Sequence, residues 1–261
     1  MDEMSGTPYR ARGRVRSADG TRIVYERRGE GAPVILVGGA LSTAGTERPL
    51  AGLLAPRYSV VTYDRRGRGG SGDTGPYGVA REIDDLAALI DEVGGRVFVH
   101  GVASGGALAL AAAGGGVPIE RLSVFEPPFS TEAGARDAFT WRRRRLAGLL
   151  DRGQHGAAVE MFLGEEPVPA WEAPRLEAVA HTLAYDHEVL GDGTVPAARL
   201  GRVHTRALVV DGGSSPARTR RAALAVARAL PRGRHRTLTG QTHQVAPHVL
   251  APVLEDFFEE E

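Results

Sequence analysis

Residues 97–106 read VFVHGVASGG: an apolar, β-branched run, then a glycine-flanked turn, then small residues. The helix-favouring alanines and leucines of residues 107–113 follow directly. This order predicts a strand that turns sharply into a helix, with Ala103 at the tip of the turn. Gly101 and Gly105 stand two places on either side of Ala103, where a tight and strained turn admits only small residues.

Short apolar runs elsewhere in the chain predict the other strands of one sheet. They cover residues 34–37, 58–63, 122–125 and 207–210. Such runs are typical of strands that helices cover on both faces, as in a parallel sheet. Helical patterns alternate with them, the clearest at residues 79–93, 222–230 and 245–258. The alternation predicts an α/β fold with right-handed crossovers and a doubly wound, mostly parallel sheet, preceded by a hairpin that turns at Ala18-Asp19-Gly20.

The pattern changes between about residue 130 and residue 200. This stretch holds helical patterns with prolines between them and no clear strand. We therefore expect residues 130–200 to form a helical cap that packs over one end of the sheet. The core of the α/β fold is then expected to comprise residues 1–129 and 201–261.

Composition narrows the class of protein. The 261 residues include 32 basic and 32 acidic side chains, so no overall field attracts nucleic acid or an anionic membrane. The chain has no apolar run of about 18 residues, the length of a membrane span, and no apolar signal segment at its N-terminus. We therefore expect a cytoplasmic protein. Cysteine is absent, which excludes disulfides and thiol nucleophiles.

No cofactor or metal is expected. The sequence has no Walker loop, no dinucleotide fingerprint after the first strand, and no lysine that could form a Schiff base. His181, Asp186 and His187 are of metal-ligand type, but on a helix they point to different faces, so structural roles fit better. The expected partner is a small-molecule substrate, with neither nucleic acid nor membrane, and the oligomeric state is left open.

Four motifs in order carry a family resemblance. The turn at Ala103 has the frame of a nucleophile elbow, G-x-S-x-G, with alanine in place of the serine. Residues 64–71, DRRGRGGS, match the pattern D-x-R-G-x-G-x-S, Gly38-Gly39-Ala40 stand where an oxyanion turn is expected, and His243 follows the last strand. From about Arg14 to its end, the chain resembles the α/β-hydrolase superfamily, and more closely the small bacterial hydrolases whose elbow reads roughly G-H-S-S-G.

The resemblance implies roles for several residues. His243 would be the catalytic histidine, and the backbone N–H groups of Ala40 and Ser104 would form the oxyanion hole, with Gly39 in the same turn. Family members usually carry the acid that orients this histidine beyond the strand at residues 207–210, where this chain has Ser215-Pro216. Glu126, after the preceding strand, holds an alternative acid position. We favour Glu126 over Asp211, with an ordinary loop carboxylate as the simpler interpretation of Glu126.

Other interpretations of these segments fit the sequence less well. A dinucleotide-binding turn requires G-x-G-x-x-G, whereas the glycines here are spaced G-x-x-x-G-G. An elbow shifted by one residue would make Ser104 the nucleophile, but it would put Val102 where a small residue is needed. Trp141, His181 and Tyr185 could line a pocket in the cap or simply pack its helices. The four arginines at 142–145 span a whole helical turn, so at most one or two of them could point inward.

Alanine at the elbow limits the chemistry. A methyl group cannot attack a carbonyl, and a hydrolase without its nucleophile keeps only roughly 10³–10⁴-fold acceleration. That is below the roughly 10⁶-fold expected of an evolved enzyme. An oxyanion hole and a histidine could still support proton transfer, cyclisation, elimination or general-base hydrolysis of a carbonyl compound.

Three hypotheses follow. The first is a natural enzyme without a serine nucleophile, acting non-covalently on a small metabolite, as in bacterial secondary metabolism. The second is a serine ester or lactone hydrolase that was inactivated by an engineered serine-to-alanine change at Ala103. The third is a non-catalytic binding protein on a hydrolase fold. Val102, Gly70 and Ser215 also depart from the family pattern, which favours natural divergence over a single engineered change.

Overall fold

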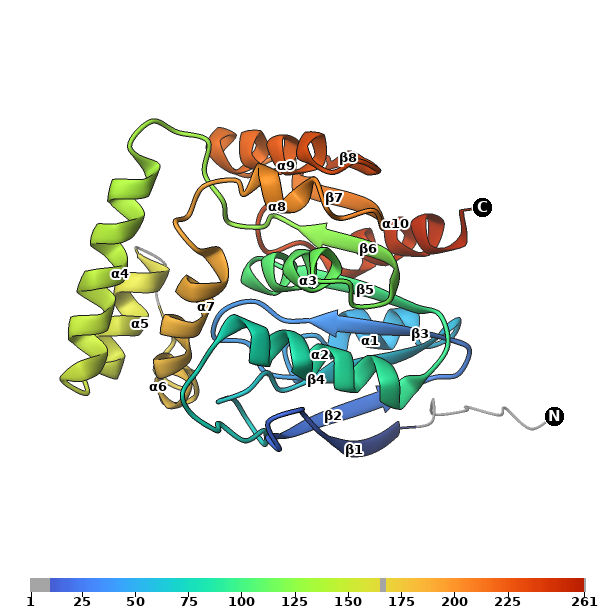
Figure 1. Cartoon of the computed structure of the whole chain (residues 1–261), viewed down its shortest axis with the longest axis horizontal. Helices are drawn as coiled ribbons and strands as arrows, with labels where there is room; N and C mark the ends of the chain where they lie inside the picture. Colours follow the sequence, from blue (N-terminus) through green and yellow to red (C-terminus); the bar gives the residue numbers. More distant parts are fainter. Residues whose placement is uncertain (1–9, 165–167, 261) are drawn as a thin grey trace.

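The computed structural model describes residues 10–164 and 168–260, and an eight-stranded sheet forms its centre (Figure 1). The strands are β1 (Arg10–Arg16), β2 (Arg22–Arg28), β3 (Ala32–Val37), β4 (Tyr58–Tyr63), β5 (Val97–Val102), β6 (Ile119–Phe125), β7 (Arg206–Gly212) and β8 (Gly233–Leu238). Across the sheet they follow the order β1-β2-β4-β3-β5-β6-β7-β8. β2 pairs antiparallel with β1 and β4, and the remaining neighbours are parallel. The predicted fold class, a doubly wound and mostly parallel α/β sheet, is confirmed.

Helices cover both faces of this sheet. They are α1 (Arg48–Leu54), α2 (Val79–Val93), α3 (Ser104–Gly114), α9 (Ala217–Ala229) and α10 (Pro247–Glu259). Ile35 and Val37 of β3 belong to an apolar cluster with residues of α2, α3 and α9, whereas Val34 and Leu36 belong to a cluster with α1 and α10. Successive strand residues point to opposite faces, so burial on both faces explains the continuous apolar runs in the sequence.

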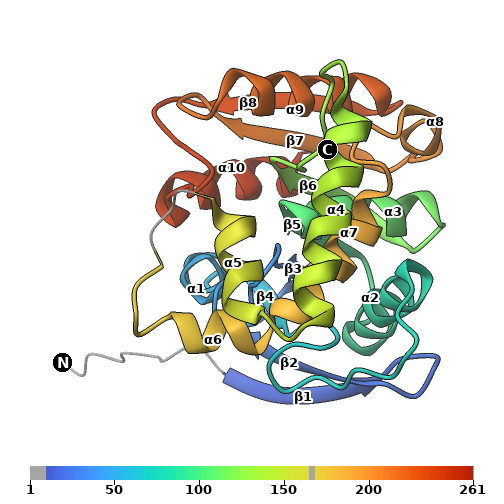
Figure 2. The ribbon, with the colours of Figure 1, turned by 90° about the vertical axis from the view of Figure 1, so that its left-hand side faces the viewer.

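The chain between β6 and β7 forms several helices joined by loops where the structure describes it. It forms α4 (Ala135–Asp151), α5 (His155–Leu163), α6 (Ala173–Ala178), the 3₁₀ turn η1 (Ala180–Thr182), α7 (Leu183–Leu190) and α8 (Ala197–Leu200). Helices α4 to α7 lie beyond the carboxyl ends of the parallel strands (Figures 1 and 2). Leu146, Val159 and Leu183 from three of these helices share a buried cluster. The exact division into a core of residues 1–129 and 201–261 and a cap of residues 130–200 stays a prediction.

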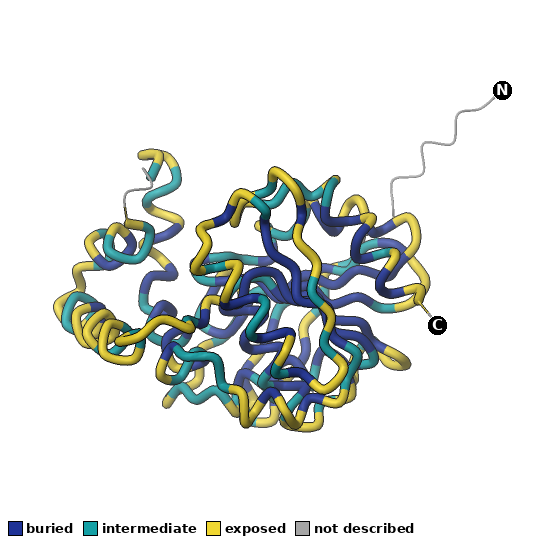
Figure 3. The backbone as a smooth tube through the Cα atoms, turned by 90° about the horizontal axis from the view of Figure 1, so that it is seen from above, coloured by how far each residue is buried: buried dark blue, intermediate teal, exposed yellow. Residues whose placement is uncertain are grey.

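Burial is concentrated in the sheet and in the helix faces turned toward it (Figure 3). Helix α4 is exposed over most of its surface, because Leu146 is its one buried residue. No helix within the described ranges, 10–164 and 168–260, is both long and apolar enough to cross a membrane.

Candidate active site

The turn between β5 and α3 has an unusual backbone at Ala103. Its φ is 49° and its ψ is −121°, a region that residues with a side chain rarely adopt. The Ala103 N–H donates a 2.9 Å hydrogen bond to Phe125 O at the end of β6, and the Ala103 carbonyl accepts a 3.1 Å bond from the N–H of Ala107. A conformation of this kind costs about 1–3 kcal/mol and is characteristic of functional sites.

The two glycines that flank Ala103 are required by close backbone contacts. A Cβ on Gly101 would lie 2.6 Å from Gly106 Cα, and a Cβ on Gly105 would lie 2.3 Å from Val37 O. Both distances are far shorter than a van der Waals contact, so larger residues would force the turn apart. The sequence requirement for small residues on either side of Ala103 thus has a direct steric cause.

The side chain of Ser104 faces the protein interior. Ser104 is 2% exposed, and its hydroxyl donates a 2.7 Å hydrogen bond to Asp186 Oδ1 of α7. Asp186 also accepts a 2.8 Å hydrogen bond from Arg65 Nη1 and a 2.8 Å hydrogen bond from Arg68 Nη2. Burial raises the pKa of Asp186, but the positive charges of Arg68 and Arg65 lower it by more. The pKa is therefore below its ordinary value, and the carboxylate is charged.

The turn after β3 lies directly against Ala103. A Cβ on Gly39 would be only 3.2 Å from Ala103 Cβ. The Gly39 carbonyl accepts hydrogen bonds from Arg68 Nη1, at 2.5 Å, and from the Ser42 hydroxyl, at 2.6 Å. In a planar trans peptide the C=O and the following N–H point in opposite directions. The N–H of Ala40 is therefore directed away from Arg68 and Ser42.

His243 and Glu126 form a hydrogen-bonded pair at the carboxyl end of the sheet. His243 Nδ1 lies 2.7 Å from Glu126 Oε2, and Glu126 Oε1 accepts a 2.9 Å bond from the N–H of Gly212. Glu126 is 1% exposed and has a positive φ of 44°. Burial raises the pKa of Glu126, but the hydrogen bonds from His243 and Gly212 outweigh it, so the pKa lies below its ordinary value. Glu126 therefore holds the imidazole through Nδ1, and this hydrogen bond does not involve Nε2.

Asp211, the other acid considered for this role, lies elsewhere. Its Oδ2 is 2.8 Å from Nε2 of His235 on β8, and Asp211 is fully buried. The structure thus pairs Asp211 with His235 and Glu126 with His243. The idea that Asp211 contacts His243 is wrong for this structure, because its partner comes from the neighbouring strand.

A cavity of about 880 Å³ opens beside His243 and Glu126. The helix α4 and the start of α9 contribute to its lining, with three phenylalanines and two arginines among the side chains, Phe129, Phe139, Phe162, Arg142 and Arg218. Its described lining does not include Ala103, Gly39, Ala40 or Ser104, which belong to the adjoining turns.

The three aromatic and imidazole side chains considered for a pocket do not line this cavity. Trp141 is 60% exposed and contacts the guanidinium of Arg145. Tyr185 stacks on Tyr77 with ring centroids 3.9 Å apart, and its hydroxyl bonds to Asp73. His181 Nε2 lies 3.4 Å from the same Asp73 carboxylate. Of the two alternatives considered, lining a pocket or packing, the contacts favour packing for two of them: Tyr185 and His181 pack against the loop before α2, whereas Trp141 faces outward.

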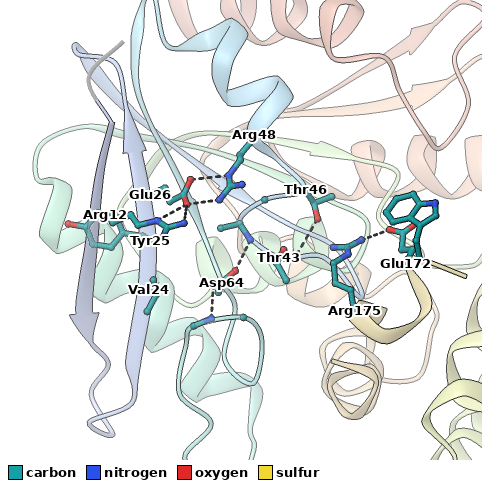
Figure 4. Close-up of a pocket in the computed structure, with 15 residues that line it drawn as sticks. Arg12, Val24, Tyr25, Glu26, Thr43, Thr46, Arg48, Asp64, Glu172 and Arg175 are labelled. Atoms are coloured by element: carbon teal, nitrogen blue, oxygen red, sulfur yellow. Dashed lines mark hydrogen bonds and ion pairs between the residues drawn. The ribbon is translucent and has the colours of Figure 1, made fainter. Parts of the chain in front are cut away.

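A second hollow, of about 700 Å³, lies between β2 and α6 (Figure 4). Its charged groups already have partners there. Glu26 accepts hydrogen bonds from Arg12 and Arg48, and Asp64 accepts the N–H groups of Ala44 and Gly70. Its third carboxylate, Glu172, is paired with Arg175. Because all three acids of the hollow are engaged in such contacts, we take the His243 cavity as the candidate site.

Comparisons with known proteins agree with the fold. A model of the α/β-hydrolase family matches residues 19–255. The crystal structure of an α/β hydrolase from Sphaerobacter thermophilus is 49% identical and covers 94% of this chain and 100% of its own, with a TM-score of 0.84. A putative carbamate hydrolase, RutD, from Azorhizobium caulinodans is 37% identical over 90 residues, and a non-heme haloperoxidase from Rhodococcus erythropolis is 35% identical over 95.

These similarities differ in extent. The matches to the carbamate hydrolase and the haloperoxidase cover 34% and 35% of this chain, and the same shares of those two proteins. The family match, by contrast, extends from the turn between β1 and β2 into α10, and so includes the turn at Ala103, the turn after β3 and the His243–Glu126 pair. With the sheet order and the motifs in agreement over that span, the chain belongs to the α/β-hydrolase family.

Proposed function

We propose that this chain is an enzyme that acts on a small carbonyl compound without a serine nucleophile. The observation that carries the proposal is the elbow itself: Ala103 occupies the strained turn, while the hydroxyl of Ser104 is bonded to Asp186. A serine nucleophile needs a base within hydrogen-bond reach, and Ser104 has a buried carboxylate as its partner in place of His243. The chemistry is therefore non-covalent.

His243 is the proposed acid–base group, and Glu126 its orienting acid. In the hydrolytic form, His243 Nε2 removes a proton from a water molecule as the water oxygen bonds to the carbonyl carbon. The carbonyl π electrons move to its oxygen, where the N–H groups of Ala40 and Ser104 are proposed to stabilise the negative charge. When the intermediate collapses, the leaving group departs with the proton from His243, which restores the neutral imidazole.

In the proton-transfer form, His243 removes a proton from the carbon beside the carbonyl and returns it at another position or with loss of a leaving group. The same oxyanion donors would stabilise the enolate. The partial match to a putative carbamate hydrolase supports a carbonyl centre, because a carbamate is attacked at its carbonyl carbon.

The first experiment measures both proposed reactions, hydrolysis and proton transfer beside the carbonyl. The chain is incubated in D₂O with phenyl acetate, which reports hydrolysis, and with phenylacetone, which reports exchange beside the carbonyl, and both are followed by ¹H NMR against an enzyme-free blank. We expect acceleration of at least one reaction, which His243→Ala abolishes and His235→Gln, the other acid-paired histidine, retains. Unchanged turnover in His243→Ala refutes the acid–base role of His243. If neither reaction is accelerated, the result supports a non-catalytic binding protein.

A serine ester or lactone hydrolase with a replaced nucleophile is the second candidate. The intact strained turn at Ala103 and the intact His243–Glu126 pair favour it. Ala103→Ser assayed with p-nitrophenyl acetate separates the two candidates. Strong esterase activity in that variant favours the replaced nucleophile, and continued inactivity supports the non-covalent enzyme.

A further inference from the structure

The cavity beside His243 has an uneven distribution of charge. Its lining includes two arginines, Arg142 on α4 and Arg218 in the first turn of α9, and two acids, Glu126 and Glu132. Glu126 accepts a hydrogen bond from His243. Glu132 accepts one from Arg221, which lies outside the lining. Both acids of the cavity are thus already paired.

The two arginines have no such partner. Within residues 10–164 and 168–260, neither Arg142 nor Arg218 makes an ion pair or a side-chain hydrogen bond. Two neighbouring arginines of α4 are paired, in contrast: Arg136 lies 2.8 Å from Asp192, and Arg143 lies 3.7 Å from Glu188. Arg142 and Arg218 are therefore the charged groups of this cavity that are left for a ligand.

The rest of the lining combines polar residues, among them Ser130, Ser214 and Gln244, with an apolar part. Phe129, Phe139 and Phe162 line the cavity together with Pro127 and Pro128. Phe129 is 7% exposed, and Phe139 and Phe162 are half-buried, so their rings offer a surface for a hydrocarbon body. Arg142 and Phe139 both come from α4, which puts a cation and an apolar wall on one helix.

We propose that the cavity binds a substrate with a carboxylate on an aryl or alkyl body, the carboxylate lying between Arg142 and Arg218. This inference rests on the proposed function only in taking the His243 cavity as the place of reaction. A guanidinium matches the planar carboxylate with two parallel N–H bonds, and a cation from each wall would hold the anion across the opening. The phenylalanines would cover the body and leave the carbonyl toward His243.

The test is a binding measurement with two probes of equal size. The first is 3-phenylpropionate and the second its neutral amide, 3-phenylpropionamide, each titrated into the full chain at pH 7 by isothermal calorimetry and NMR. We expect the acid to bind about tenfold more tightly than the amide, because the exposed Arg142 and Arg218 would each contribute one charge pair to its binding. Added salt should weaken binding of the acid and leave that of the amide unchanged.

Substitutions identify the residues responsible. The double variant Arg142→Gln/Arg218→Gln should bind both probes alike. Arg144→Gln is the matched control, since Arg144 is an exposed arginine of α4 outside the lining, and it should keep the tenfold difference. Equal affinities in the unmodified chain, no binding of the acid at millimolar concentration, or the same loss in Arg144→Gln would each overturn the inference. Because no turnover is involved, failure of the proposed chemistry leaves this result unaffected.

Discussion

The Ser104 hydroxyl donates a 2.7 Å hydrogen bond to Asp186 Oδ1, and both residues are 2% exposed. The contact joins the first turn of α3 to α7, which comes from the helical segment after β6. Arg68 donates both to Asp186 and to the Gly39 carbonyl in the turn after β3. One buried carboxylate therefore links the turn at Ala103, the turn after β3 and α7, and it holds the Ser104 hydroxyl in the interior.

Removal of this carboxylate should be strongly destabilising. Asp186→Ala leaves Arg65 and Arg68, both 2% exposed or less, without one of their buried counter-charges. Breaking a buried ion pair by removing one partner costs about 3–5 kcal/mol. We expect a loss of that size in the free energy of unfolding, measured by urea denaturation followed by far-UV circular dichroism.

Glu188→Ala is the control for Asp186→Ala. Glu188 is on the same helix, but its carboxylate is exposed and lies 3.7 Å from Arg143. Exposed pairs of this kind contribute about 0–1 kcal/mol. Similar losses in the two variants would contradict the central role assigned to the buried carboxylate.

The central strands could be predicted from sequence because a strand that is buried on both faces consists of consecutive apolar residues. The apolar run at residues 58–63 coincides with β4, Tyr58–Tyr63. The opposite case is β8, an edge strand whose exposed Arg234 and Arg236 leave no apolar run. Within the helical pattern at residues 79–93, the acid Asp85 is fully buried, although a charged side chain is ordinarily found on the exposed face of such a helix.

Asp85 is buried because it has a charged partner, which the spacing of apolar residues along the helix cannot reveal. Asp85 accepts two hydrogen bonds from Arg66, which precedes α2 in the chain. The same holds at the site: family motifs pointed to His243 and Glu126, whereas the Asp186 network and the arginines of the cavity required coordinates. Contacts between residues distant in sequence decide which polar side chains are buried, and no local pattern encodes them.

Stability should fall in mild acid because of His100. Burial lowers the pKa of this histidine to about 3 in the folded chain, against about 6.5 when unfolded. Between these values the unfolded state binds more protons, so stability increases with pH and is lost as the pH falls below about 6.5. We expect His100 to account for a loss of about 2 kcal/mol between pH 6.5 and 5.0, measured by urea denaturation at each pH.

His100→Leu should make this pH dependence shallower, whereas His248→Leu, which changes an exposed histidine, should leave it as it is. An identical slope in His100→Leu and the unmodified chain would show that other groups cause the acid sensitivity.

The close contact at Gly105 makes a steric prediction. The Cβ of Gly105→Ala would lie 2.3 Å from Val37 O and 2.5 Å from Gly38 O, both backbone atoms that a rotamer change cannot move. We expect a loss of at least about 3 kcal/mol in the free energy of unfolding. Gly52→Ala is the matched control: it is inside α1 with no heavy atom within 4 Å of the added Cβ, and it should gain about 0.5–1 kcal/mol. A neutral Gly105→Ala would mean that the β3 turn can move aside.

The last prediction separates the two acids. Glu126→Gln keeps the shape of the side chain but removes the charge that orients His243 and stabilises its imidazolium. In a histidine–acid pair the neutral amide allows the wrong tautomer, and we expect the His243-dependent exchange or hydrolysis to fall by about 10³–10⁴-fold. Asp211→Asn makes the same chemical change at a fully buried acid whose partner is His235, so its rate should stay within a few-fold of the unmodified chain. ¹H NMR rates on equal amounts of folded protein, checked by circular dichroism, keep stability out of the comparison. A greater loss in Asp211→Asn than in Glu126→Gln would reverse the assignment and place the working histidine on β8.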